Sequence, residues 1–160
     1  MIEAIVAVYA DWGIGCGGTQ PVTLRADRKR FREATDGKAV IVGRRTLADF
    51  PGGRPLKNRR NIVLTRQNIE IPGAQTARSP QEALSLAGEG AVVIGGASVY
   101  RDMLPYIDRI YVTKIALTPE SDSFFPDLDE DPGFFCADPG TPLDEDGIAY
   151  RFCVYERRRP

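Results

Sequence analysis

The chain has 160 residues, of which 42% are apolar and 27% charged, and its net charge at neutral pH is −1. These values exclude a disordered chain and a protein held to nucleic acid by an excess of positive charge, and the length predicts one domain, residues 1–160. The sequence contains no histidine, which removes the commonest general base and the commonest zinc ligand. We therefore expect no metal site, and we favour a chemistry in which a cofactor performs the difficult step.

Cysteine usage and hydropathy bear on the compartment. The three cysteines, Cys16, Cys136 and Cys153, lie far apart and lack metal-ligand spacing. No apolar run approaches the roughly 20 residues of a membrane span, and the start of the chain looks like a strand rather than a basic signal. We expect a cytoplasmic protein in a reducing setting, with no membrane partner.

The first strand leads into a glycine-rich loop and a helix. Residues 2–9 are nearly all apolar, which is typical of a strand covered on both faces, and glycines 13, 15, 17 and 18 follow. A helix is predicted to start near Leu24, with Thr23 as its N-cap. Leu24, Phe31 and Ala34 form an apolar stripe whose spacing needs position 27 as its missing member.

That missing member is Asp27. A carboxylate on an apolar stripe loses hydration unless a partner or a ligand pairs with it. The alternative is an aspartate in the first helical turn, favoured by the helix dipole and facing water. Because flexible glycines precede it, we favour a pocket with a lid.

Further strands alternate with helices. Short apolar runs at 39–42, 61–64, 91–94 and 109–116 read as strands, and helices are predicted from Ser79–Pro80 and over 99–104, where Pro105 ends the second. This alternation predicts a mostly parallel sheet with helices on both faces. The runs 134–137 and 149–156 have no helix between them and are expected to pair antiparallel at one edge.

Groups suited to phosphate follow three of the strands, and ligands of open parallel sheets bind at strand carboxyl ends. They are Gly95 with Gly96, then Arg44, Arg45 and Thr46, and finally Thr65 with Arg66. Each has an ordinary alternative, a tight turn for the glycines and solvated side chains for the rest, and the GxGxxG pattern is absent. Together they fit an extended dinucleotide better than a mononucleotide.

Basic residues crowd the predicted helix at positions 25, 28, 29, 30 and 32. Because acids interrupt them and they surround the helix, we interpret most of them as a solvated surface and expect no nucleic-acid partner. Arg28 is the exception, since it lies beside Asp27 and three residues before Phe31, and we expect it at the edge of the same pocket.

Taken together, these residues resemble the dihydrofolate reductases of the bacterial chromosomal type over essentially the whole chain. The segments that carry the resemblance are Gly13-Ile14-Gly15, Leu24 with Ala26-Asp27 and Phe31, Val42-Gly43-Arg44 with Thr46, Arg59 with Asn61-Ile62-Val63-Leu64, Ile94-Gly95-Gly96 with Val99-Tyr100, and Phe125-Pro126-Asp127. The resemblance implies NADPH-dependent reduction of 7,8-dihydrofolate to tetrahydrofolate, binding of antifolate inhibitors, a monomer, and a mostly parallel eight-stranded sheet with an antiparallel C-terminal edge.

The resemblance also implies roles for individual residues. The catalytic set would be Asp27, Thr113 and Tyr100, with Asp27 binding the pterin and assisting protonation of N5 and Thr113 hydrogen-bonded behind it. Substrate would contact Ile5, Ala7, Asp27, Arg28, Phe31, Phe50, Leu56, Arg59, Ile94 and Thr113. The cofactor would contact Ala7, Ile14, Gly43, Arg44, Arg45, Thr46, Leu64, Thr65, Arg66, Gly95, Gly96, Ala97, Ser98, Val99, Tyr100 and Ser123. Arg59 would take the glutamate carboxylate, and Gly95 and Gly96 would be joined by a cis peptide.

Four positions depart from the family pattern. Val22 follows Pro21 where a tryptophan is usual, and Arg25 replaces a common proline. Gln20 stands where an apolar loop residue is usual, and Arg28 replaces an apolar or amide residue beside the substrate. Our hypothesis is that Arg28 and Gln20 weaken trimethoprim-like antifolates more than they weaken dihydrofolate.

Two other functions stay open on the sequence. One is the reductase of riboflavin synthesis, which shares this fold and uses NADPH, although Asp27 with Phe31 and Arg59 argues against it. The other is a nucleotide-binding module that has lost catalysis, which the absence of tryptophan at position 22 makes conceivable.

Overall fold

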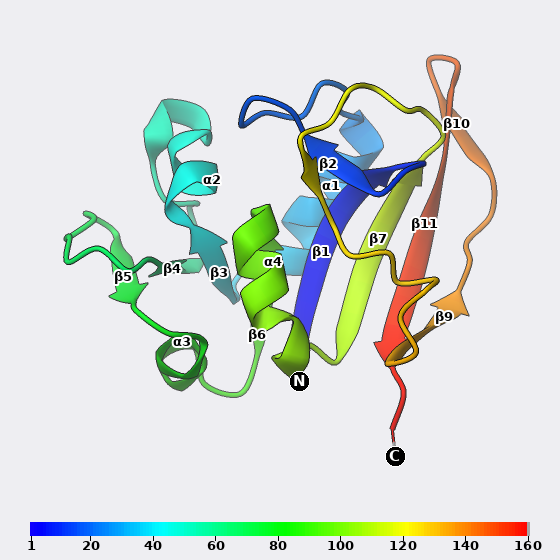
Figure 1. Ribbon diagram of the computed structural model, residues 1–160. Coiled ribbons are helices and arrows are strands. Elements are labelled where there is room, and N and C mark those ends of the chain that lie inside the picture. Colours follow the sequence, from blue (N-terminus) through cyan, green and yellow to red (C-terminus); the bar gives the residue numbers. More distant parts are fainter. Residues whose placement is uncertain (160) are drawn as a thin grey trace.

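One twisted sheet carries the fold of residues 1–159, the part of the chain that the computed structural model describes (Figure 1). The strands are β1 (Ile2–Tyr9), β2 (Gly13–Gly15), β3 (Ala39–Gly43), β4 (Arg60–Leu64), β5 (Ala74–Ala77), β6 (Ala91–Gly95), β7 (Arg109–Ile115), β8 (Ser123–Phe124), β9 (Phe134–Asp138), β10 (Leu143–Glu145) and β11 (Ile148–Arg157). The helices are α1 (Arg25–Thr35), α2 (Arg44–Ala48), α3 (Pro80–Ala87) and α4 (Ala97–Met103), with single 3-10 turns η1 (Pro51–Gly53) and η2 (Leu104–Tyr106).

The main sheet confirms the predicted topology. Its eight-strand path runs β10-β11-β7-β1-β6-β3-β4-β5, and β9 pairs with β11 beside β10. The pairs from β7 to β5 are parallel, whereas β11 is antiparallel to β7 and to both β9 and β10. Strands β2 and β8 form a separate antiparallel pair. The carboxyl ends of β1, β3, β4, β6 and β7 therefore lie along one edge of the sheet.

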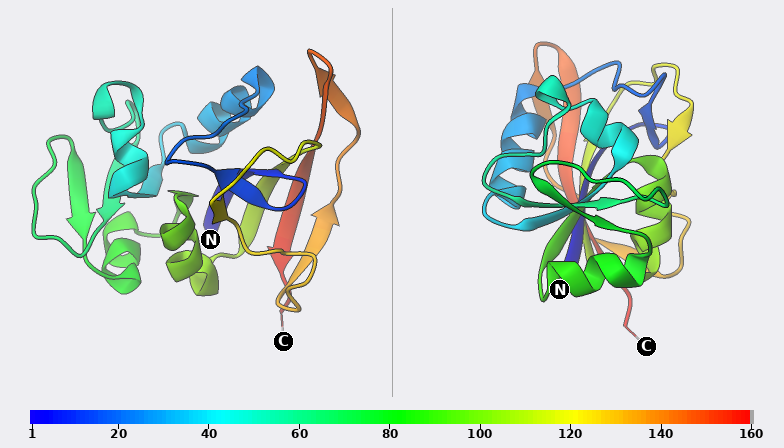
Figure 2. Two further views of the ribbon diagram at one scale, coloured as in Figure 1. Left: turned by 45° about the horizontal axis from the view of Figure 1, so that its top comes forward. Right: turned by 90° about the vertical axis from the view of Figure 1, so that its left-hand side faces the viewer.

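Apolar side chains cover both faces of the sheet, as the first strand predicted. In β1 the side chains of Ala4, Val6 and Val8 enter one buried cluster, which α3 and α4 cover. The alternate residues Ile5, Ala7 and Tyr9 enter the clusters on the other face, to which α1 and α2 contribute. Figure 2 shows α1 and α4 on opposite sides of the strands. Successive side chains of a strand point to opposite faces, which explains why an almost entirely apolar run contributes to two cores.

The N-cap predicted for α1 is wrong. The helix begins at Arg25, one residue after the expected start, and its N-cap Leu24 makes no side-chain capping bond. Instead the Glu145 carboxylate accepts hydrogen bonds from the amides of Arg25 (2.8 Å) and Ala26 (2.9 Å). These bonds hold the pKa of Glu145 below its usual range, because they favour the charged carboxylate. A hairpin about 120 residues away thus satisfies the orphan amides of the helix.

Several short elements escaped the sequence patterns. Strands β2, β5, β8 and β10 have two to four residues each and were not predicted. The helix expected over 99–104 begins earlier, at Ala97, and Pro105 lies in the turn η2 that follows α4. The helix expected at Ser79–Pro80 is confirmed, with the Ser79 hydroxyl accepting from the Glu82 amide at 3.1 Å.

Within residues 1–159, no helix combines the length and the hydropathy that a membrane crossing requires.

Candidate active site

Asp27 lies on α1 beside β7, in a partly buried position. The hydroxyl of Thr113, a fully buried residue of β7, donates a hydrogen bond of 2.6 Å to Asp27 Oδ1. Burial raises the pKa of the Asp27 carboxyl, and the Thr113 hydroxyl and the guanidinium groups of Arg30 and Arg28 oppose that rise. The acid therefore faces the sheet rather than bulk solvent, and it keeps its proton at a higher pH than an exposed aspartate.

Apolar side chains gather on the same face of the sheet. Ile5 and Ile94 are buried at neighbouring positions of β1 and β6, and the partly buried Phe31, Phe50 and Leu56 pack in their cluster. Ala7, two residues along β1, belongs to the adjoining cluster with Leu24. The structure thus brings together the apolar residues predicted to contact substrate. Because three of them keep part of their surface free, the cluster offers an apolar wall to a flat ligand.

Arg59 lies near the end of α1. Its Nε donates to Thr35 Oγ1 at 3.2 Å and its Nη1 to the Lys57 carbonyl at 2.8 Å. The Thr35 hydroxyl in turn donates to the carbonyl of Phe31 at 2.8 Å. Arg59 also lines a pocket of about 360 Å³ beside Asn61 and Ala74. These bonds fix the base of the Arg59 guanidinium at the Phe31 end of the apolar wall.

Arg28 is exposed and turns toward the loop before α1. Its Nη1 donates to the hydroxyl of Thr23 at 3.0 Å. Thr23, which was predicted to cap the helix, thus accepts a hydrogen bond from the Arg28 guanidinium instead. Arg28 stays near the acid, since its charge opposes the rise that burial causes in the pKa of Asp27.

Gly95, the last residue of β6, and Gly96 after it lie against the end of β3. The Gly95-Gly96 peptide is cis, as the resemblance implied. A Cβ added to Gly43 would lie 3.0 Å from Val99 Cγ2, and one added to Gly96 would lie 3.0 Å from Thr46 Oγ1. An added Cβ would therefore be crowded where the two strand ends meet, and the main chain there is bare. Such a surface lets a ligand approach the main chain closely.

The other predicted cofactor residues surround this bare backbone. Exposed Ser98 and partly exposed Ala97 open α4, and Thr46 is partly exposed in α2. Arg44 and Arg45 are exposed, and Arg44 Nη1 hydrogen-bonds Gln67 Oε1. Leu64 and Thr65 are partly exposed at the end of β4, followed by exposed Arg66. The three phosphate-competent groups therefore share the carboxyl edge of the sheet.

The glycine-rich loop is tied to the segment around Ser123. Gly15 pairs with Ser123 between β2 and β8, and the Gly17 amide donates to Asp122 Oδ2 at 3.0 Å. Ile14, between two buried glycines, is partly exposed. Ile14 and Ser123, both predicted at the cofactor, thus lie together although they are more than 100 residues apart.

Tyr100 ties α4 to the first strand. Its buried hydroxyl donates to the carbonyl of Ile5 at 2.7 Å, and burial raises its pKa strongly. A phenol with a raised pKa stays neutral, so it acts here as a hydrogen-bond donor. The hydroxyl is directed at main chain beside the predicted substrate wall.

Arg30 is the residue that the sequence interpretation missed. It was assigned to a solvated surface, yet its Nη1 donates to Thr113 Oγ1 (3.4 Å) and its Nη2 to the Cys153 carbonyl (3.1 Å). Its guanidinium also lies 4.6 Å from the ring centre of Phe152 and 5.4 Å from that of Tyr111. Its position three residues after Asp27 was the one available signal, because residues at i and i+3 share a helix face.

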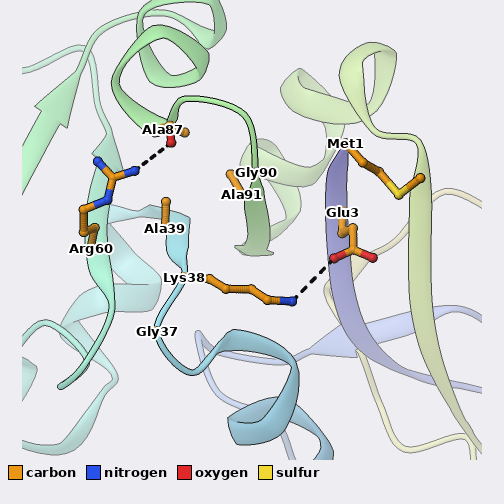
Figure 3. Close-up of a pocket in the computed structure, with 9 residues that line it drawn as sticks. All are labelled: Met1, Glu3, Gly37, Lys38, Ala39, Arg60, Ala87, Gly90 and Ala91. Atoms are coloured by element: carbon orange, nitrogen blue, oxygen red, sulfur yellow. Dashed lines mark hydrogen bonds and ion pairs between the residues drawn. The ribbon is translucent and has the colours of Figure 1, made fainter.

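A separate pocket of about 390 Å³ opens at the amino ends of β1, β3 and β6 (Figure 3). It contains the ion pair between Lys38 Nζ and Glu3 Oε1, at 3.8 Å, and Arg60 donates to the Ala87 carbonyl at 2.6 Å on its rim. None of the predicted site residues lines it. It belongs to the opposite edge of the sheet from Gly95 and Gly96.

No group of three or more acidic, cysteine or histidine side chains is placed to hold a metal ion within residues 1–159.

Comparisons with known proteins point to one family. The profile of the dihydrofolate reductase family matches residues 1–157. The dihydrofolate reductase of Bacillus subtilis is 36% identical over 162 aligned residues, which cover 99% of this chain and 95% of that protein, and the one from Bos taurus is 39% identical, covering 98% and 97%. A solved structure of the Enterococcus faecalis enzyme, complexed with NADP(H) and RAB-propyl, is 31% identical with a TM-score of 0.89, covering 99% of this chain and 97% of the other. The chain belongs to the dihydrofolate reductase family.

Proposed function

We propose that Asp27 is the acid with which this protein, an NADPH-dependent dihydrofolate reductase, binds the pterin and assists protonation of N5. The observation that carries the proposal is the 2.6 Å hydrogen bond from Thr113 to a partly buried carboxyl. This bond occupies Oδ1 and orients the carboxyl, so that Oδ2 can accept from the pterin's amino group. Because burial raises the pKa of Asp27, the acid holds its proton to a higher pH than an exposed aspartate, which suits it to proton transfer.

The apolar wall would orient the substrate. Phe31, Phe50 and Leu56, backed by Ile5 and Ile94, supply faces against which flat rings stack and from which water is excluded. Arg59, whose base is held by Thr35 and Lys57, would bind the glutamate carboxylate through its remaining donors. Orientation of this kind supplies a large share of the rate when two rings must meet face to face.

The residues at the strand ends fit the cofactor, which supplies a hydride when bound. The bare backbone of Gly43 and Gly96, where a Cβ would meet a neighbour at 3.0 Å, leaves room for close approach along the main chain. Arg44, Arg45 and Thr46 would hold the pyrophosphate, and Thr65 with Arg66 the 2′-phosphate. Ala7, Ile14, Leu64, Ala97 to Tyr100 and Ser123 would complete the contact surface, with Tyr100 holding the Ile5 carbonyl in place.

The test is the loss of absorbance at 340 nm with NADPH and dihydrofolate. Asp27→Asn is expected to keep NADPH binding and to lose most turnover at neutral pH, because an amide cannot share the proton. Glu33→Gln, which removes an exposed acid from the same helix, is the matched control and should leave turnover unchanged. Wild-type turnover by Asp27→Asn would refute the role of the acid, and activity only on a ribosylated pyrimidine would place the protein in riboflavin synthesis.

We also propose reduced sensitivity to trimethoprim-like antifolates. Arg28 and Gln20 are exposed on the loop side of α1, and Arg28 is held there by Thr23. A cation at the pocket edge favours a substrate that carries a carboxylate tail over an inhibitor without one. Inhibition constants for the wild type and Arg28→Leu test this idea: the variant should bind trimethoprim more tightly, and equal constants would end the proposal.

The compartment, the domain count and the oligomeric state of the protein are also proposals. Cys16, Cys136 and Cys153 are all free thiols in the structure, which supports a reducing cytoplasm. We propose that residues 1–160 act as one domain and as a monomer. Light scattering on the purified protein should give a mass near 17.6 kDa, and a multiple of that mass would contradict the monomer.

A further inference from the structure

Arg30 is held in one place by four different contacts. Its Nη2 donates to the Cys153 carbonyl, its Nη1 to the Thr113 hydroxyl, and its guanidinium lies over the rings of Phe152 and Tyr111. These partners come from β7 and β11, which pair in the sheet. A long, flexible side chain held by these contacts beside a partly buried acid does more than carry charge at the surface.

The direction of the hydrogen bonds at Thr113 follows from this placement. A guanidinium has only donors, so the Thr113 oxygen accepts from Arg30 and its single proton is left for Asp27. The bond from Thr113 to Asp27 then runs from hydroxyl to carboxylate. A carboxyl group that accepts such a bond is stabilised in its charged form.

We propose that Arg30 is a positioning residue for the acid: it keeps the Thr113 hydroxyl turned toward Asp27 and, through its charge, favours the carboxylate. The inference rests on the role proposed for Asp27 above. Arg30 thereby opposes the burial that favours the protonated acid, and it sets the pH at which Asp27 changes state.

Other charged or titratable groups also face this pair. Around Asp27 they are Arg28 of α1, Glu145 of β10 and Tyr100 of α4, and around Arg30 they are Tyr111 of β7, Cys153 of β11 and Asp138 of β9. Arg28 is exposed and bonded to Thr23, so water screens its charge more effectively. Of the two cations that act on Asp27, Arg30 is the one with a hydrogen-bonded route to it.

The experiment titrates the acid directly, in the ligand-free protein. The carboxyl carbon of Asp27 is followed by NMR after labelling with ¹³C-aspartate, and its signal is assigned by its loss in Asp27→Asn. In Arg30→Met the midpoint should rise by about 0.5 to 1 pH unit, because a nearby cation and an oriented donor are both lost. Arg30→Lys should recover most of that shift, because it keeps the charge.

Lys29→Met is the matched control. It removes one positive charge from the next position of α1, where the side chain is exposed and pairs with Glu33, and its midpoint should move by less than about 0.2 unit. Circular dichroism checks that the variants fold. If Arg30→Met does not fold, Arg30→Gln replaces it, and the same upward shift is expected because the charge is again lost.

Turnover provides the second readout. The pH at which dihydrofolate reduction falls to half its maximum should rise with the NMR midpoint in Arg30→Met and return in Arg30→Lys. An unshifted midpoint in a folded variant without the Arg30 charge overturns the inference, as does an equal shift in Lys29→Met. Absence of turnover in the wild type would overturn the proposed function alone, since the carboxyl titration needs no substrate.

Discussion

Replacing Thr113 with valine tests how the fold holds its acid. The change removes a fully buried hydroxyl that donates to Asp27 at 2.6 Å and accepts from Arg30 at 3.4 Å. A hydrogen bond to a charged partner is worth about 1.5–3 kcal/mol, and one between neutral groups about 0.5–1.5 kcal/mol. Loss of the Thr113–Asp27 bond alone should therefore destabilise the protein by about 1.5–3 kcal/mol when Asp27 is ionised and by about 0.5–1.5 kcal/mol when it is protonated, and loss of the longer bond from Arg30 adds a cost that does not depend on that change.

The difference between these two values has a definite pH dependence. Because the folded pKa of Asp27 is raised by burial, its protonated form contributes stability that is fully present below the unfolded value of about 3.9 and is lost as pH rises through the folded pKa. Thr113 opposes that rise, so the valine moves the folded pKa higher. The stability deficit should grow with pH by about 1 kcal/mol, which corresponds to a further upward shift of about one pH unit.

Urea unfolding from pH 4 to pH 8, followed by the emission of the single tryptophan, Trp12, measures the deficit. Trp12 is buried on the face of the sheet away from Asp27, so it reports unfolding rather than local change. The control is the same substitution in an Asp27→Asn background, where the pH dependence should vanish. A deficit of equal size at every pH, or one whose pH dependence survives in that background, would refute the reasoning.

Three other substitutions probe the surrounding structure. Tyr100→Phe should lower the free energy of unfolding in urea by about 0.5–1.5 kcal/mol, because the Ile5 carbonyl loses its 2.7 Å donor. The control Tyr106→Phe, which removes a hydroxyl from an exposed hydrogen bond with Gln81, should cost less. Equal costs would contradict the buried bond. Glu145→Ala should speed hydrogen exchange at the amides of Arg25 and Ala26, which lose their acceptor, and should lower the melting temperature, and unchanged exchange would argue against the cap. Gly96→Ala should weaken NADPH binding about tenfold in a fluorescence titration, because its Cβ meets Thr46 at 3.0 Å. The control is Gly90→Ala, whose Cβ meets nothing within 4 Å. Equal NADPH affinities of the two variants would contradict a role for the bare backbone at Gly96.

Local patterns predicted the parts of the fold that depend on local sequence. The apolar run of β1 and the start of α3, with Ser79 as cap and Pro80 in the first turn, rest on interactions within a few residues. Asp27 was found because its position breaks an apolar stripe. In contrast, the edge strand β5, with the sequence Ala-Gln-Thr-Ala, shows no apolar alternation, since only Ala77 is buried.

What the sequence did not reveal depends on partners far along the chain. Thr23 is a good cap by residue type, but Glu145 takes that place from the β10–β11 hairpin. Arg30 looked solvated among neighbouring cations, because its acceptors Thr113 and Cys153 are more than 80 residues away. Periodicity within a helix predicts which residues share a face. Which of those residues are buried depends on the strands that pack against the helix in the folded protein.

The cap on α1 has a consequence for biosynthesis. Glu145 is synthesised about 120 residues after the start of α1, whose amides donate hydrogen bonds to it. The part of β11 that supplies the Cys153 carbonyl to Arg30 follows still later. A nascent chain stalled before this point lacks both contacts, so the start of α1 is uncapped and Arg30 has lost one of its acceptors. Enzymatic competence should therefore appear late in translation, so truncated chains would be exposed to cellular proteases before they could bind a folate.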